Sequence, residues 1–226
     1  MKYISIDIET TGLDPENHSI LTIGAVIEDT EKPDIPIKEL PTFHALILRN
    51  DFKGSAFAIN MNHEIIETMV KYQTARTQED KLAISEEYGY EFFQEEDVVI
   101  GLFRFLWKNG IFLDILKVYN YPFERLGEVS YPVVTSKMPK MYLNIAGKNF
   151  GTFDKLFLEK LPRWKQVFRI RNRILDPAIL FVDWKKDEAL PGLSLCKERL
   201  GISGFVSHDA VDDARDVISL LRTQYK

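Results

Sequence analysis

Two acidic residues near the start of the chain lie two positions apart in a segment with a strand pattern. In residues 2–9 three isoleucines alternate with polar residues, and the side chains of a strand alternate between its two faces. Asp7 and Glu9 therefore leave the strand on the same face, where they repel each other unless a cation lies between them. Magnesium and manganese prefer such hard oxygen ligands. The pair predicts a divalent-metal site, although solvated strand faces also carry such pairs.

Two further acids interrupt the apolar faces of predicted helices. Asp154 lies in a predicted helix over residues 153–161, on the stripe with i, i+3, i+4, i+7 spacing. Asp213 lies on the apolar stripe of a predicted last helix over residues 210–223. An acid at the start of a helix also suits the helix dipole. A carboxylate that faces the protein interior nevertheless needs a partner, so both acids are candidates for the same site.

His208 comes directly before the predicted last helix. A histidine titrates near neutral pH and can serve as a general base. A single histidine is normally unremarkable, but this one precedes an inward-facing acid, Asp213. Asp209 and Asp212 fit a helix cap and a first-turn acid instead.

The elements that must position these residues follow from hydrophobic periodicity and turn signals. Residues 2–9, 20–27 and 43–48 predict three strands of an antiparallel meander, with a proline-rich loop over 33–41. Asn62 predicts the cap of a helix that runs to Tyr72 and buries Ile65, Ile66, Met69 and Val70. Further helices are predicted over 98–108 and 193–200, a short buried strand over 143–146, and the end of a strand at 174–175. Strands followed by alternating strands and helices predict a mixed α/β sheet covered by helices.

The composition is that of an ordinary globular protein, with a net charge of −5. Acids that hold cations would account for part of this charge. A basic stretch either follows a phosphate backbone or is a solvated face; it holds Lys160, Arg163, Lys165, Arg169, Arg171 and Arg173. No secretory signal or membrane-spanning run is expected, and Cys196 has no disulfide partner, so we expect a cytoplasmic protein without a membrane partner.

Three segments resemble the exonuclease motifs of the DEDD (DnaQ-like) superfamily, in the order in which that superfamily has them. Residues 7–14, Asp-Ile-Glu-Thr-Thr-Gly-Leu-Asp, resemble the first motif. Residues 149–154, Asn-Phe-Gly-Thr-Phe-Asp, resemble the second. Residues 208–214, His-Asp-Ala-Val-Asp-Asp-Ala, resemble the third in its histidine form, the DEDDh branch. Residues 175–177 and 193–202 are similar to the stretch that precedes the third motif.

The resemblance implies a ribonuclease-H-like α/β fold and a set of residue roles. It implies one exonuclease domain over residues 1–226, with a helical insertion within about 50–140. Two divalent cations, Mg²⁺ or Mn²⁺, would be bound by Asp7, Glu9, Asp154 and Asp213. His208 would accept the proton of the attacking water. The substrate would be contacted by Thr10, Thr11, Gly12, Leu13 and Asn149.

Some features depart from the family pattern. The interval from Asn149 to Asp154 is one residue longer than in many members, and Lys148 stands where a histidine often precedes that asparagine. The interval between the first two motifs is also long. Within it, residues 58–62 are candidates for substrate contact, although a plain helix cap explains them better.

The function implied is a 3′-to-5′ exonuclease that acts on nucleic-acid 3′ ends and releases nucleoside 5′-monophosphates, with single-stranded DNA slightly favoured. One alternative is an exoribonuclease or an oligoribonuclease-like enzyme. Others are a catalytically idle module that binds 3′ ends and a metal phosphohydrolase of small nucleotides. The sequence leaves open the choice between DNA and RNA, the oligomeric state, and any polymerase or repair partner.

Overall fold

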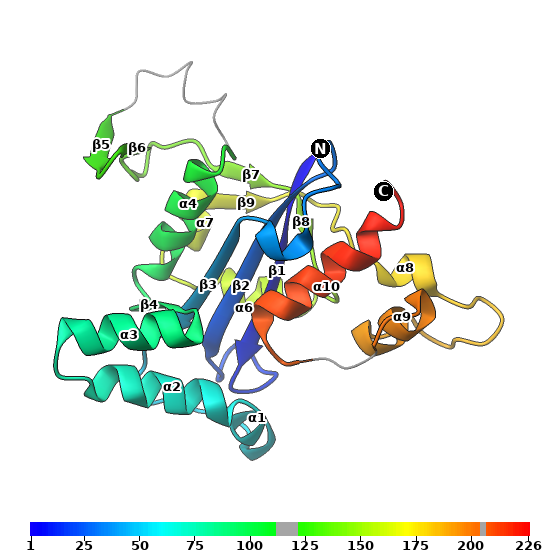
Figure 1. The fold of residues 1–226 in the computed structure, drawn as a ribbon, viewed down its shortest axis with the longest axis horizontal. Helices are drawn as coiled ribbons and strands as arrows, with labels where there is room; N and C mark the ends of the chain where they lie inside the picture. Colours follow the sequence, from blue (N-terminus) through cyan, green and yellow to red (C-terminus); the bar gives the residue numbers. More distant parts are fainter. Residues whose placement is uncertain (112–121, 204–206) are drawn as a thin grey trace.

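The structure, a computed structural model, describes residues 1–111, 122–203 and 207–226. A five-stranded sheet lies at its centre, in the order β4-β3-β2-β1-β8 (Figure 1). Its strands are β1 (Lys2–Thr10), β2 (Ile20–Asp29), β3 (Thr42–Ile47), β4 (Glu91–Phe93) and β8 (Ile145–Ala146). β1, β2 and β3 form the antiparallel meander that was predicted, while β4 and β8 add in parallel at the two edges. The predicted mixed α/β sheet flanked by helices is confirmed.

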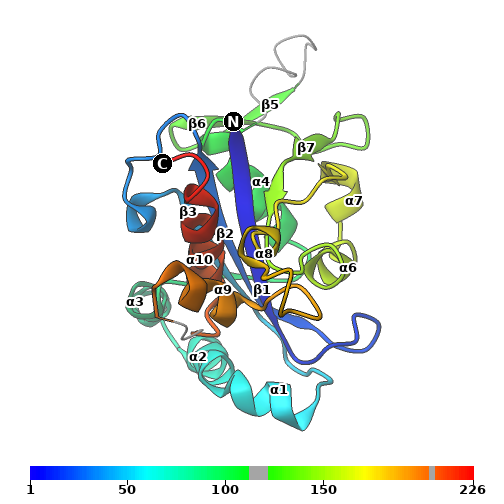
Figure 2. The same ribbon diagram turned by 90° about the vertical axis from the view of Figure 1, so that its right-hand side faces the viewer.

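Helices cover both faces of the sheet because β1 has an apolar side chain on each face (Figures 1 and 2). Its isoleucines pack with α4 (Val98–Lys108), α6 (Asp154–Leu158) and α7 (Trp164–Val167). On the other face, Tyr3 packs with α10 (Ala210–Arg222). Tyr3 shares that face with Asp7 and Glu9 by strand alternation. The acids of β1 therefore lie on the side of the sheet that α10 covers.

Residues 50–140 contain helices, as expected, and also strands that the sequence did not indicate. The helices described there are α1 (Ala56–Met61), α2 (His63–Thr74), α3 (Gln78–Tyr88) and α4. A hairpin of β5 (Phe123–Leu126) and β6 (Val129–Pro132) follows. The proline-rich loop over 33–41 contains a short 3₁₀ turn, Ile37–Glu39.

Asn62 is the N-cap residue of α2, as predicted, but its side chain makes no cap hydrogen bond. Its amide donates instead to the carbonyl oxygens of Thr10 (3.1 Å) and Ala58 (3.2 Å). One prediction for the buried face of α2 is wrong. Val70 is exposed, because the buried face of α2 holds Ile65, Thr68 and Met69.

The strand predicted over 143–146 is in fact two strands in different sheets. β7 (Met141–Leu143) pairs with β9 (Phe168–Ile170), whereas β8 pairs with β1. Asn144 separates them: its carbonyl oxygen accepts from the Ile4 amide at 2.9 Å, and its side chain donates to the Lys2 carbonyl at 3.1 Å. Leu175 forms an isolated bridge with Ala146 instead of ending a longer strand. α6 is shorter than predicted, because i→i+3 hydrogen bonds follow it from Lys160 and Leu161.

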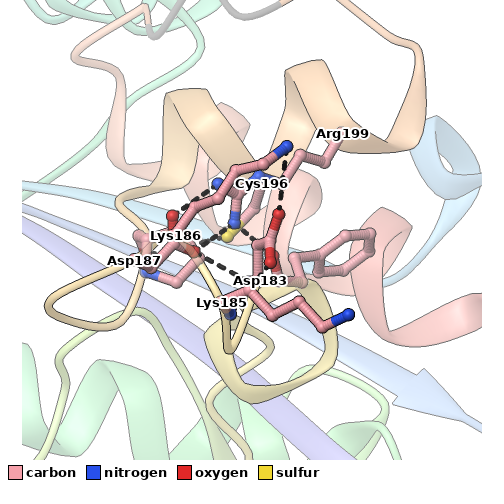
Figure 3. A network of polar contacts seen from close by, with 8 residues as sticks. Asp183, Lys185, Lys186, Asp187, Cys196 and Arg199 are labelled. Atoms are coloured by element: carbon pink, nitrogen blue, oxygen red, sulfur yellow. Dashed lines mark hydrogen bonds and ion pairs between the residues drawn. The ribbon is translucent and has the colours of Figure 1, made fainter.

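A polar network fastens the connection between α8 (Ala178–Phe181) and α9 (Leu193–Leu200) (Figure 3). Arg199 donates to both carboxylate oxygens of Asp187 and to the Phe181 carbonyl oxygen. Asp187 accepts from the Asp183 amide at 2.8 Å.

α9 has the predicted bounds and ends at Gly201, which adopts φ 80°. In the described part of the chain, no helix combines the length and the apolar character needed to cross a membrane.

A buried ion pair holds the C-terminal end of α10 against β2. Glu28 is fully buried, and its Oε2 lies 2.8 Å from Nε and 2.7 Å from Nη2 of Arg222. Arg222 also donates to the carbonyl oxygen of Ile35 at 2.8 Å. A charge taken out of water is tolerated where it is paired and hydrogen bonded, so each partner depends on the other.

We expect Glu28→Ala to lower the free energy of unfolding by about 3–5 kcal/mol, because it leaves the Arg222 charge buried without its counter-ion. Urea unfolding followed by circular dichroism measures the change. Glu124→Ala is the matched control, since it breaks the exposed pair with Arg104 and should cost less than about 1 kcal/mol. Equal losses in the two variants would contradict the assignment of Glu28 as an anchor of α10.

Candidate metal-binding active site

Three carboxylates from the two ends of the chain converge on one face of the sheet. Asp7 and Glu9 extend from β1, and Asp213 from the first turns of α10. One carboxylate oxygen of each lies within 4.8 Å of the others. Asp7 and Glu9 share the face that strand alternation predicted, and Asp213 faces inward as its position on the apolar stripe indicated.

A glycine in β2 allows α10 to approach the sheet closely enough to form this cluster. Gly24 pairs with Asp7 in the antiparallel register. A Cβ at Gly24 would lie 2.3 Å from the carbonyl carbon of Ala210 and 2.5 Å from the amide nitrogen of Val211. Real Cβ atoms do not approach backbone so closely, so any other residue would push the start of α10 away. Glycine serves here as it does wherever two backbones must touch.

Asp154 lies beside this cluster at the start of α6. It is buried, with 3% of its surface exposed. A backbone hydrogen bond from Ile8 ties its carboxylate to β1, and its charge raises the pKa of Asp7. It stands outside the group of three whose oxygens lie within 4.8 Å.

Burial raises the pKa of every acid in the site, and the charges of neighbouring acids raise the pKa of Asp7, Glu9 and Asp213 further. Burial and then the charges of Asp154, Asp213 and Glu9 raise the pKa of Asp7 well above its usual value. Burial, then the charge of Asp213, raises the pKa of Glu9 to about 8. Burial is also the main cause that raises the pKa of Asp154 and of Asp213 to about 7. The protein thus holds acids where a negative charge is costly.

This donor set fits a divalent cation. The Oδ1 atom of Asp213 is buried and accepts no hydrogen bond from the described residues. Such an atom costs free energy unless another group binds it. A hard cation between the oxygens of Asp7, Glu9 and Asp213 would supply that partner and would cancel the repulsion among them.

His208 lies at the surface, directly before the cap of α10, the helix that carries Asp213. It is outside the group of three acids. It adopts φ 55° directly before Asp209, the N-cap of α10. Its side chain is exposed and lines a groove of about 510 Å³ together with Glu64 of α2 and Tyr88 of α3. The residues before it, 204–206, lie outside the described structure. Its role as a base therefore stays a prediction.

The predicted substrate residues differ in their exposure. Thr10 and Thr11 are buried, and their hydroxyls donate to the carbonyl oxygens of Gly12 (2.8 Å) and Lys53 (2.5 Å). Leu13, in contrast, is 81% exposed at the tip of the turn. Asn149 is exposed with φ 58°, and its side chain accepts from the Thr152 hydroxyl. The threonines shape the turn. Among the predicted substrate residues 10–13, Leu13 is the one whose side chain is exposed to solvent.

Sequence reasoning missed His44 of β3, which supports the start of α10. Its Nε2 lies 3.5 Å from Oδ2 of Asp209, and its ring lies 4.1 Å from that of Tyr90. The Oδ1 atom of Asp209 accepts from the amides of Val211 and Asp212. A polar residue within the apolar run of β3 was a signal, but its pairing with Gly24 appears only in the register.

Asn62, at the predicted N-cap position of α2, has a second role that the sequence did not indicate. Its side chain, buried behind the turn after β1, donates to the Thr10 carbonyl oxygen. A hydrogen bond from the same side chain lowers the pKa of Glu9 and so offsets part of the effect of burial. Asn62 therefore joins α2 to the end of β1 at the site.

The raised pKa values predict how pH affects the metal-free protein. Between the unfolded pKa near 4 and the folded values of about 7 for Asp213 and about 8 for Glu9, the folded chain holds protons that the unfolded chain has lost. The stability contributed by these acids is complete below about pH 4 and disappears as pH rises through the folded values. In chelator, Tm should fall between about pH 5 and 8, and Mg²⁺ or Mn²⁺ should restore it at the upper end.

Asp213→Asn is the control for this pH effect, because it removes one charge from the cluster. Its Tm in chelator should improve relative to the native chain as pH rises. Thermal scans at matched ionic strength measure the difference. If the Tm of Asp213→Asn differs from that of the native chain by the same amount at every pH, Asp213 does not carry a raised pKa.

The comparisons with known proteins agree with this geometry. A family model described as Exonuclease (RNase_T) matches residues 4–123, which is slightly more than half of the chain. That segment contains Asp7 and Glu9 and ends before Asp154 and Asp213. A comparison with curated protein sequences gave no match.

Several solved exonuclease structures are similar in fold. E. coli exonuclease I in complex with a dT13 oligonucleotide is 13% identical, with a TM-score of 0.52 over 98% of this chain and 40% of that one. The nuclease domain of 3′hExo, a DEDDh family member bound to rAMP, is 14% identical, with a TM-score of 0.54 over 98% of this chain and 90% of that one. The chain thus spans about 40% of the length of the exonuclease I structures it matches. Its fold is the ribonuclease-H-like fold of these solved exonucleases. Because the family model matches more than half of its residues, the chain belongs to the exonuclease family.

Proposed function

We propose that the protein is a metal-dependent 3′-to-5′ exonuclease that removes nucleoside 5′-monophosphates from the 3′ end of nucleic acid. The observation that carries this proposal is the convergence of Asp7, Glu9 and Asp213 within 4.8 Å, with Asp154 beside them. Four acids held together against their repulsion have a cost, which a bound cation would offset. Membership of the exonuclease family supplies the reaction class.

The four acids would hold two divalent cations, Mg²⁺ or Mn²⁺. When bound, such cations supply positive charge at the phosphate and lower the pKa of water. Asp7, Glu9 and Asp213 would fix their position, and Asp154 would complete the set from α6. The water oxygen forms the new bond to phosphorus, the bond to the 3′ oxygen breaks, and that oxygen takes a proton. The products are a nucleoside 5′-monophosphate and a strand that is one nucleotide shorter.

His208 would accept the proton of the attacking water. Its position five residues before Asp213, next to the N-cap of the same helix, supports this role. The contact between His44 and Asp209 would hold that end of α10 in place. The two histidines thus have different tasks: His208 moves a proton, and His44 positions the helix.

The turn after β1 would receive the terminal nucleotide. The apolar side chain of Leu13 is exposed there and can pack on a base, while the backbone of Thr10–Gly12 sets its position. Asn149, which is exposed in the segment before α6, would also contact the substrate. The solved structures with this fold include one with a dT13 oligonucleotide and one with rAMP. We propose single-stranded DNA as the preferred substrate, with RNA as the second candidate.

The decisive experiment follows 5′-labelled and 3′-labelled oligomers of DNA and RNA, with metal and with chelator. A 5′-labelled single strand should shorten in a ladder with Mg²⁺ or Mn²⁺, and chelator should stop the reaction. Asp7→Asn should abolish hydrolysis without unfolding the protein, because it removes a metal ligand from β1. Asp212→Asn is the matched control, since that acid lies on the exposed side of α10 and pairs with Arg215. Cleavage of circular single-stranded DNA at a comparable rate would contradict the exonuclease proposal.

A second experiment separates His208 from the acids. His208→Ala should lose activity by about 100- to 10,000-fold, the usual contribution of a general base, yet bind metal nearly as well. The loss should shrink toward high pH, because hydroxide replaces the base. Asp213→Ala should bind metal weakly and gain nothing from high pH. Rates between about pH 6 and 9, which span the histidine pKa, and calorimetric metal titrations measure both.

His63→Ala is the control for this comparison, because His63 is an exposed histidine whose ring contacts the Asn60 carbonyl oxygen. It should keep the native rate. If His208→Ala also keeps the native rate over the whole range, His208 is not the base.

A further inference from the structure

The small sheet of β7 and β9 presents an aromatic ring between two arginines. In its parallel register Tyr142 lies opposite Arg169. The guanidinium carbons of Arg169 and Arg171 lie 5.5 Å and 5.6 Å from the centre of the Tyr142 ring. All three side chains are exposed. Their neighbours in the strands, Leu143 and Phe168, are buried, so strand alternation sends the apolar residues inward and this cluster outward.

The two arginines have no carboxylate partner among residues 1–111, 122–203 and 207–226. The two lysines of the basic stretch are paired: Lys160 lies 2.5 Å from Glu16, and Lys165 lies 3.8 Å from Glu159. The arginines in and directly after β9 are therefore available for a ligand, whereas these lysines near α6 are not. Two arginines without carboxylate partners beside one exposed ring thus form a local positive patch in a chain with a net charge of −5.

This surface lies away from the acids. Tyr142 lines a cavity with Lys2, Tyr3 and Ile4 at the start of β1, and Figures 1 and 2 place β7 opposite α1 and α2 along the sheet. With a rise of ~3.3 Å per residue along β1, Glu9 is about 20 Å further on. That span corresponds to on the order of six stacked nucleotides at 3.4 Å each.

We propose that Tyr142, Arg169 and Arg171 form a second nucleic-acid-binding surface, which holds the single-stranded part of the substrate upstream of its 3′ end. The guanidinium groups can bind phosphates, and the ring and guanidinium planes can stack on bases. A duplex offers no exposed base faces, so the surface favours single strands. This inference rests on the proposed function for its ligand, and its test does not depend on hydrolysis.

The test measures binding in chelator, where metal-dependent hydrolysis is off. Fluorescence anisotropy with 5′-labelled oligomers compares a 15-nucleotide strand, a 3-nucleotide strand and a 15-base-pair duplex, in DNA and in RNA. Arg169→Ala/Arg171→Ala should weaken binding of the long single strand by about tenfold or more, as loss of stacking and phosphate contacts does. The slope of log K against log salt should fall by about 1.4, at ~0.7 per phosphate contact.

Three further variants identify the cause. Arg169→Lys/Arg171→Lys keeps the charge but not the planar groups, and Tyr142→Ala removes the ring; both should keep the salt slope and lose affinity. Lys32→Ala/Lys38→Ala removes the same charge from the exposed β2–β3 loop and should bind as the native chain does.

Several results would overturn the proposal. One is native-like binding of the long strand by the Arg→Ala double variant, and another is an equal loss for the short strand. A third is an equal loss in the Lys→Ala double variant, which would show a response to net charge alone. If these binding results hold while no metal supports hydrolysis, the surface stands and the proposed catalytic function fails.

Discussion

The start of α10 lies directly on the backbone of β2 at Gly24, and the candidate site depends on that contact. A helix that covers a sheet normally stands off by the length of the intervening side chains. Here the missing Cβ brings Ala210 against the strand, one strand away from Asp7. Asp213, about one helical turn further on, then reaches the carboxylates of β1.

Other contacts along α10 keep it in this position. At its start, Asp209 caps the helix with one oxygen and approaches His44 with the other. In the middle, Asp216 pairs with the buried Lys197 of α9. At its end, Arg222 is bound by the buried Glu28. Each contact joins α10 to a different element, so the helix is held against sliding and rotation, which would both move Asp213.

The cost of this arrangement is electrostatic. The pKa of Glu9 is raised to about 8 and that of Asp213 to about 7, which means that the folded protein opposes the charged form of its own acids. A cation reverses this preference, because it interacts with the charged form alone. Metal binding, loss of protons and stability are therefore one coupled equilibrium. The same coupling would connect the fold to the proposed reaction, since a bound cation would favour the charged form of the acids.

The sequence by itself determined the meander, most of the helices and the side of each element on which an acid lies. Strand alternation placed Asp7 with Glu9, and helical periodicity turned Asp154 and Asp213 inward, because both patterns are local. The tertiary structure decided what depends on contacts between distant segments. The division of residues 143–146 between two sheets follows from hydrogen bonds to Lys2 and Ile4. The pairing of Gly24 with both Asp7 and His44 is set by strand register. Asn62 lies at the predicted N-cap of α2, but its side chain binds the end of β1 instead of the helix. Periodicity fixes which way a side chain points, but the partner it meets depends on the packing of segments that are far apart in the chain.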